Sequence, residues 1–126
     1  MMKVCTNRIK RIAQQEVNFD LRYNHCAFII SKDKILAKEV NQKKTHPLII
    51  KYGYKMNAHL HAELAVVIKH GITNCHNSTL VVVRVRSNGD LALSKPCDCC
   101  SRMIFEIGFR SVYFSTDDGT LEEMER

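Results

Sequence analysis

Two short motifs, far apart in the chain, carry the side chains that restrict its fold. The first holds His61 and Glu63, two residues apart, and the second holds Cys97 and Cys100, three residues apart and directly after Pro96. Zn²⁺ prefers nitrogen and sulfur ligands in a tetrahedral shell, and a catalytic zinc keeps one of its four positions open. Because one histidine and two cysteines fill the other three, we expect the fold to bring both motifs together. Glu63 then remains close to the metal without binding it, where a proton carrier is needed.

This pair of motifs resembles the signature of the zinc-dependent cytidine deaminase-like superfamily, an H-x-E followed later by P-C-x-x-C, and every position is filled here. The resemblance implies an α/β protein with a three-layer α-β-α fold around a mixed five-stranded sheet. It implies Zn²⁺ as the cofactor, held by His61, Cys97 and Cys100. It also implies an enzyme in which zinc-bound hydroxide attacks C4 of cytosine to give uracil, with Glu63 as the catalytic proton shuttle.

Each motif residue also has an ordinary structural explanation. The dipole of a helix favours a glutamate at its N-terminus, so Glu63 alone indicates no catalysis, and His61 alone is typical of a buried histidine. The cysteines could be core thiols, or could hold a structural zinc completed by Cys99, Cys75, His59 or His76. We favour the open zinc site because the structural explanations are independent of one another, and all of them would have to apply to residues that happen to have the spacing of the two motifs. In a helix, Cys99 would point away from the face that Cys97 and Cys100 share.

The resemblance also suggests which residues bind the substrate. Asn41 follows the second expected strand, where related deaminases hold the sugar with an asparagine; a turn residue that satisfies local backbone is the alternative. Backbone N–H groups in the first turn of the helix that holds Ala62 would face a substrate oxygen. Carbonyl oxygens near Ser94 and Lys95 are expected to hold the departing amine. Lys95 stands where the family is expected to have serine or glutamate, which leaves the subfamily open.

The length of 126 residues, without a composition break that suggests a linker, predicts one domain, residues 1–126. Hydrophobic periodicity predicts that helices and strands alternate along it. The expected helices are 4–17, 61–69 and 97–108. The expected strand segments are 26–30, 35–40, 79–85, 91–93, 111–115 and 120–124. The last two are predicted to form an antiparallel hairpin at Asp118-Gly119, which favours the topology of free-nucleoside deaminases over that of tRNA- and DNA-editing ones.

Residues 41–58 are expected to form a long loop that ends at the metal site and provides one wall of its pocket. Within it, Tyr52 and Tyr54 are expected to pack in the core or at the rim, with stacking on a base as the alternative. Two of the six cysteines have an expected metal-ligand role and the other four are scattered, and this favours the reducing cytoplasm over a disulfide framework. No apolar run is long enough to suggest a membrane segment.

The net charge of +6 lies mostly in the first half, where residues 1–60 hold 12 Lys and Arg against 4 Asp and Glu. Such a surface attracts phosphate on a nucleotide or a nucleic acid strand, and it is equally typical of a solvated surface. The leading hypothesis is a deaminase of a free cytosine nucleoside or nucleotide, such as cytidine, deoxycytidine or dCMP. The alternatives are a deaminase of cytosine or adenine within RNA or single-stranded DNA, and a non-catalytic binding module stabilised by zinc. A homo-oligomer is left open.

Overall fold

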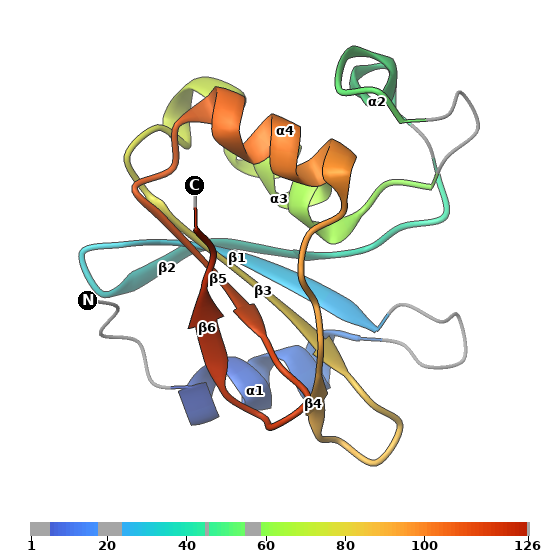
Figure 1. Cartoon of the computed structure of the whole chain (residues 1–126), viewed down its shortest axis with the longest axis vertical. Coiled ribbons are helices and arrows are strands. Elements are labelled where there is room, and N and C mark those ends of the chain that lie inside the picture. Colours follow the sequence, from blue (N-terminus) through green and yellow to red (C-terminus); the bar gives the residue numbers. More distant parts are fainter. Residues whose placement is uncertain (1–5, 18–23, 45, 55–58, 126) are drawn as a thin grey trace.

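The computed structural model describes residues 6–17, 24–44, 46–54 and 59–125. A mixed β-sheet forms the middle of the molecule, with helices on both of its faces (Figure 1). The α/β class and the mixed sheet expected from the sequence are confirmed.

The described residues form six strands: β1 (His25–Ser31), β2 (Lys34–Val40), β3 (Thr79–Val85), β4 (Leu91–Ala92), β5 (Ser111–Ser115) and β6 (Leu121–Glu123). Five of them lie in the order β2-β1-β3-β5-β6, and the two-residue β4 pairs with the end of β3. The pairing of β3 with β5 is parallel, whereas β1 with β2, β1 with β3 and β5 with β6 are antiparallel. The last of these pairs confirms the predicted C-terminal hairpin.

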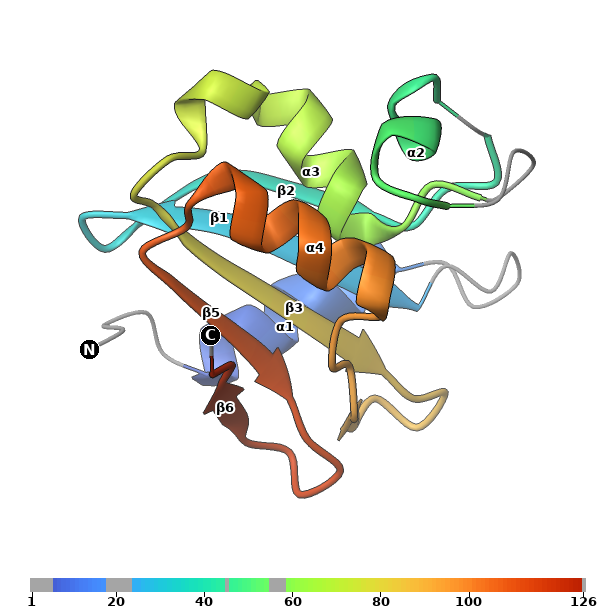
Figure 2. The same ribbon diagram turned by 45° about the horizontal axis from the view of Figure 1, so that its top comes forward.

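The described residues also form four α-helices and one short 3-10 helix: α1 (Thr6–Glu16), α2 (Leu48–Lys51), α3 (Ala62–His70), η2 (Ile72–Asn74) and α4 (Asp98–Ile107). Helix α1 packs on one face of the sheet, and α3 and α4 pack on the other (Figures 1 and 2). Residues 4 and 5 of the first predicted helix lie outside the described residues. Within the described part of the chain, no helix is long and apolar enough to cross a membrane.

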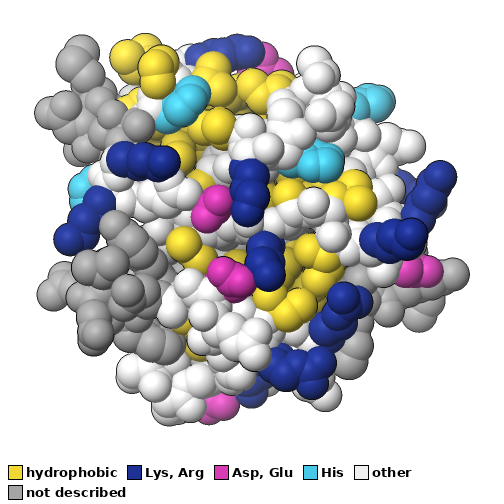
Figure 3. Space-filling model, turned by 180° about the vertical axis from the view of Figure 1, so that it is seen from behind, with side chains coloured by type: hydrophobic (Ala, Val, Ile, Leu, Met, Phe, Trp, Pro, Cys, Tyr) yellow, Lys and Arg dark blue, Asp and Glu magenta, His cyan; other side chains and the backbone are white. Residues whose placement is uncertain are grey.

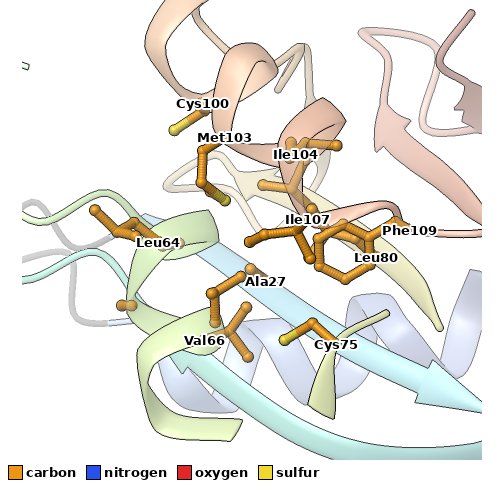
Figure 4. Close-up of a cluster of buried hydrophobic side chains, with 14 of the residues drawn as sticks. Ala27, Leu64, Val66, Cys75, Leu80, Cys100, Met103, Ile104, Ile107 and Phe109 are labelled. Atoms are coloured by element: carbon orange, nitrogen blue, oxygen red, sulfur yellow. The ribbon is translucent and has the colours of Figure 1, made fainter. Parts of the chain in front are cut away.

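Alternating side chains on the central strands make these layers. On β1, Ala27 and Ile29 face α3 and α4, whereas Cys26 and Phe28 face α1. Both sets are fully buried, which explains why this strand reads as a continuous apolar run. Figure 4 shows the larger of the two clusters, in which residues of α3 and α4 meet over the sheet: Leu64, Val66, Met103 and Ile104. Burial on both faces fixes how α3 and α4 lie relative to the sheet.

Helix α2 corrects the expectation that residues 41–58 are all loop. Leu48 donates its backbone N–H to Nδ1 of His46 at 3.1 Å, and Pro47 has a helical φ of −54°, so the two residues before the helix start its first turn. Ile49 is only 2% exposed, which anchors this turn in the core. A four-residue helix is too short to show the periodicity by which longer helices are recognised.

Candidate metal centre

The residues that begin the two motif helices meet at one point. His61 and Cys97 directly precede α3 and α4, and both have extended backbones, with φ −67° and ψ 153° at His61 and φ −68° and ψ 172° at Cys97. Each helix therefore begins one residue later than the sequence predicts, and the two side chains project from the caps of the helices. Because α3 and α4 lie side by side (Figure 2), these caps come together.

Three potential ligand atoms form a compact group there. Nδ1 of His61 lies 3.5 Å from Sγ of Cys100 and 3.7 Å from Sγ of Cys97, and the ligand atoms of all three residues lie within 4.8 Å of one another. A tetrahedral zinc with Zn–S of about 2.3 Å and Zn–N of about 2.0–2.1 Å would place nitrogen and sulfur roughly 3.6 Å apart. The spacing of this group therefore fits a single zinc ion.

The electrostatics of the two thiols also favour a cation. Hydrogen bonds with Cys100 and His61 lower the pKa of the Cys97 thiol to about 3, while the hydrogen bond with Cys97 and burial raise the pKa of Cys100. The two thiols thus share one proton, because two neighbouring thiolates in a partly buried site repel each other. A divalent cation removes this repulsion, and one nitrogen with two sulfurs is a donor set that suits zinc.

Glu63 lies beside this group but outside it. It is in the first turn of α3, is 5% exposed, and lines the same cavity as His61 and Cys97. Burial is the main cause that raises the pKa of its carboxyl group above the usual value, and the neighbouring Cys97 thiol adds to the rise. A carboxyl group whose proton affinity is increased, next to a metal site that it does not ligate, can both accept and return a proton.

None of the four residues that could have completed a structural zinc joins this group. Among residues 6–17, 24–44, 46–54 and 59–125, no fourth His, Cys, Asp or Glu joins the group. Sγ of Cys75 is hydrogen-bonded to the carbonyl of Gly71, His76 lies 3.5 Å from the carbonyl of Ile107, and Cys99 lies against Gly53. His59 lines the cavity without joining the group. The three ligands that the described chain supplies leave a fourth position for water or substrate.

A cavity of about 340 Å³ opens beside the group, within the size range of sites for small molecules. It is lined by His25, Asn41, His59, Leu60, His61, Ala62, Glu63, Ser94, Lys95 and Cys97. The structure therefore places all four residues predicted to bind substrate, Asn41, Ala62, Ser94 and Lys95, around the same space as the metal group.

Hydrogen bonds hold two of these residues in place. Oδ1 of Asn41 accepts the backbone N–H of His25 at 3.1 Å, and the N–H of Asn41 is bonded to the carbonyl of His25. The Ser94 hydroxyl donates to the carbonyl of Val82 at 2.8 Å and lies 2.8 Å from the hydroxyl of Ser115. Because the Ser94 hydroxyl is engaged inside the protein, what this residue can offer to a substrate is its backbone.

Sequence reasoning did not identify His25 as a residue of this site, and it expected Tyr54 in the core or at the rim, with stacking on a base as the alternative, but not next to a metal ligand. His25 lines the cavity from the start of β1. The sequence did not mark it as a site residue because it directly precedes an apolar run that reads as a buried strand. Tyr54 is buried, as expected of a core residue, but its hydroxyl is hydrogen-bonded to Sγ of Cys100. The one signal for His25 is its place beside Asn41, which becomes visible only when β1 and β2 are paired.

We predict that His25 makes the folded protein less stable in acid. Burial, followed by the nearby charges of Arg84 and His61, lowers the pKa of His25 from 6.5 to about 4. Between these values the unfolded chain binds more protons than the folded one, so stability falls as the pH is lowered from 6.5 towards 4. At pH 5 this difference in proton binding lowers the free energy of unfolding by on the order of 2 kcal/mol.

Urea unfolding of the zinc-loaded protein at pH 7.5 and pH 5 measures this effect. The variant His25→Gln should lose less stability between the two pH values than the wild type does. The control is His70→Gln, at the end of α3 and outside the cavity, which should retain the wild-type pH dependence. Equal losses of stability in His25→Gln and the wild type would contradict the prediction.

The sequence was then compared with known proteins. Residues 2–116 match the profile of a family described as the cytidine and deoxycytidylate deaminase zinc-binding region. The match covers most of the chain and includes both motifs and every residue that lines the cavity. A search of curated proteins gives no match.

Proposed function

The chain belongs to the family of cytidine and deoxycytidylate deaminase zinc-binding domains, and we propose that it hydrolyses the exocyclic amine of a cytosine base in a free nucleoside or nucleotide. The products are uracil, in the corresponding nucleoside or nucleotide, and ammonia. The observation that carries the proposal is a buried carboxylate, that of Glu63, in a cavity beside three zinc-type ligands that leave the fourth position open.

His61, Cys97 and Cys100 would hold the zinc ion. When bound, zinc lowers the pKa of a coordinated water to about 7 and so supplies a nucleophile at neutral pH. Glu63 would accept the proton of the attacking water, deliver it to N3 of the ring, and then protonate the departing amine. A buried carboxyl group of increased proton affinity is suited to these transfers because it can hold the proton between them.

The other lining residues would orient the base and its sugar. We assign Asn41 to the sugar, the backbone N–H of Ala62 to an oxygen of the base, and the backbone carbonyls of Ser94 and Lys95 to the amine that leaves. The position of all four around one cavity supports these roles. A cavity of about 340 Å³ is also of the size expected for a small molecule.

A nucleotide embedded in RNA or single-stranded DNA is the second candidate substrate. Exposed Lys95 lines the cavity, and exposed Lys43 and Lys44 follow Asn41, another lining residue, closely in the chain. On the face shown in Figure 3, however, Asp and Glu side chains lie beside several of the Lys and Arg side chains. Strand-binding grooves combine a continuous basic track with aromatic stacking, so we favour the free nucleoside or nucleotide.

The test is a substrate panel with zinc-loaded protein. Cytidine, deoxycytidine and their monophosphates are each assayed for ammonia and for the uracil product, and cytosine- and adenine-containing RNA and DNA strands are assayed for base conversion. We expect turnover of at least one of the four small molecules. Conversion in strands alone would favour the second candidate, and no conversion of any substrate would contradict the proposed enzyme.

The role of Asn41 makes a separate prediction. Asn41→Asp keeps the oxygen that accepts the His25 N–H but replaces the amide NH₂ with a second oxygen. If that NH₂ binds the sugar, its loss should raise KM by about 10-fold, corresponding to one hydrogen bond of roughly 1–1.5 kcal/mol, with a smaller effect on kcat. Steady-state kinetics on the best substrate of the panel measure the separate effects on KM and kcat. An unchanged KM would contradict the assignment of this NH₂ group to the sugar.

A further inference from the structure

One side chain from outside both motifs touches two of the three ligands. The hydroxyl of Tyr54 is hydrogen-bonded to Sγ of Cys100 in the buried interior. The Tyr54 ring also packs edge-on against the imidazole of His61, with ring centroids 5.0 Å apart and an interplanar angle of 76°. Tyr54 is 9% exposed, so both contacts are shielded from water.

The segment that carries Tyr54 is fixed to the core. The backbone N–H of Tyr54 is bonded to the carbonyl of Ile49 at 3.0 Å, and Ile49 and Tyr52 are 2% and 1% exposed. Gly53 has a φ of +88° and comes so close to α4 that an added Cβ would lie 2.9 Å from Nη1 of Arg102. Tyr54 is therefore held next to the metal group by packing that does not depend on the metal.

The direction of the hydrogen bond follows from ordinary acidities. A tyrosine hydroxyl keeps its proton at neutral pH, because its usual pKa is about 10. A cysteine that binds zinc has lost its proton and can only accept. Once a metal is bound, the Tyr54 hydroxyl is thus the donor and the Cys100 sulfur the acceptor.

We propose that Tyr54 is a positioning residue of the metal centre, whose hydroxyl donates a hydrogen bond to the Cys100 thiolate and whose ring orients His61. Two thiolates and a neutral imidazole would neutralise the charge of Zn²⁺ and weaken it as a Lewis acid. A hydrogen bond to one sulfur withdraws part of that electron density. It also favours the thiolate over the thiol and holds the sulfur in position for the ion, and these two effects raise the affinity for zinc. The consequence for catalysis depends on the proposed function, whereas the consequence for zinc affinity does not.

Tyr54→Phe removes the hydroxyl and keeps the ring against His61. Partners of metal ligands typically contribute 10–100-fold to metal affinity, so we expect zinc affinity, measured by competition with a chelator, to fall by about that factor. In the cobalt-substituted protein, we expect the sulfur-to-cobalt charge-transfer band to shift. The matched control is Tyr52→Phe, a buried tyrosine of the same turn whose ring lies beside the ammonium group of Lys51.

The outcomes separate this proposal from the proposed function. A loss of zinc affinity and a shifted cobalt band in Tyr54→Phe, with neither change in Tyr52→Phe, would support it even if no cytosine compound is deaminated. An unchanged affinity and spectrum in Tyr54→Phe would overturn it even if the protein is an active deaminase. Equal losses of affinity in both variants would also overturn it, because they would reflect a general loosening of the turn. Circular dichroism of each variant checks that the fold is retained.

Discussion

Replacing Glu63 with glutamine should leave a folded protein that still binds zinc and has almost no deaminase activity. Glutamine has the shape of glutamate but cannot carry the proton from water to the ring and the amine. General acid–base groups contribute about 10²–10⁴-fold to a rate, and because Glu63 would serve more than one transfer, we expect a loss at the upper end of this range or beyond it. The fold should not suffer, because burial already disfavours the charged form of this carboxyl group.

The measurements are kcat on the best substrate, zinc content and the thermal unfolding temperature. Glu106→Gln is the matched control, since Glu106 is an exposed glutamate on α4 and should retain full activity. Glu63→Gln with more than a tenth of the wild-type activity would contradict the proton-carrier role. Loss of zinc in Glu63→Gln would instead make Glu63 a ligand.

The second large effect is expected at Cys97. Structural zinc sites with four ligands bind with roughly 10–16 kcal/mol, which is about 2.5–4 kcal/mol for each ligand. Cys97→Ser should therefore weaken zinc binding by two orders of magnitude or more and abolish the activity. Because a metal that binds only the folded state stabilises it, a chelator should lower the unfolding temperature of the wild type and have little effect on Cys97→Ser.

Cys99→Ser is the matched control for that variant. Cys99 is a direct neighbour of Cys100 in the same motif, but its thiol lies against Gly53 and outside the ligand group. The protein with this substitution should retain zinc and the chelator-dependent stability of the wild type. Equal zinc loss in Cys97→Ser and Cys99→Ser, or full zinc retention in both, would contradict the assigned ligand set.

The sequence predicted best the features that depend on residue type and local spacing. Imidazole, thiols and a carboxylate at fixed spacing predicted which side chains would converge, and the structure brings His61, Cys97 and Cys100 together beside Glu63. The bounds of β3 and β5 also agree with the sequence because β-branched and aromatic residues fill both strands between clear turns.

What the sequence could not predict depends on contacts between distant segments. The partner of Tyr54 lies 46 residues away, so no local pattern marks that tyrosine as different from Tyr52. His25 reaches the cavity only because β1 pairs with β2 and brings Asn41 beside it. Helix α2 has four residues and depends on the burial of Ile49 rather than on an apolar stripe. In each case, the local structure depends on contacts between distant segments and not on the propensity of the local sequence.

X-ray absorption at the zinc edge of the purified protein tests the central claim most directly, because it counts the atoms around the metal. An open catalytic site predicts one zinc per chain with two sulfurs at about 2.3 Å and two lighter atoms at about 2.0–2.1 Å, one of them the nitrogen of His61 and the other from water. In Cys97→Ser the sulfur count of any remaining bound zinc should fall to one. Three or four sulfurs around the wild-type zinc, or a second histidine in place of water, would contradict an open site formed by His61, Cys97 and Cys100.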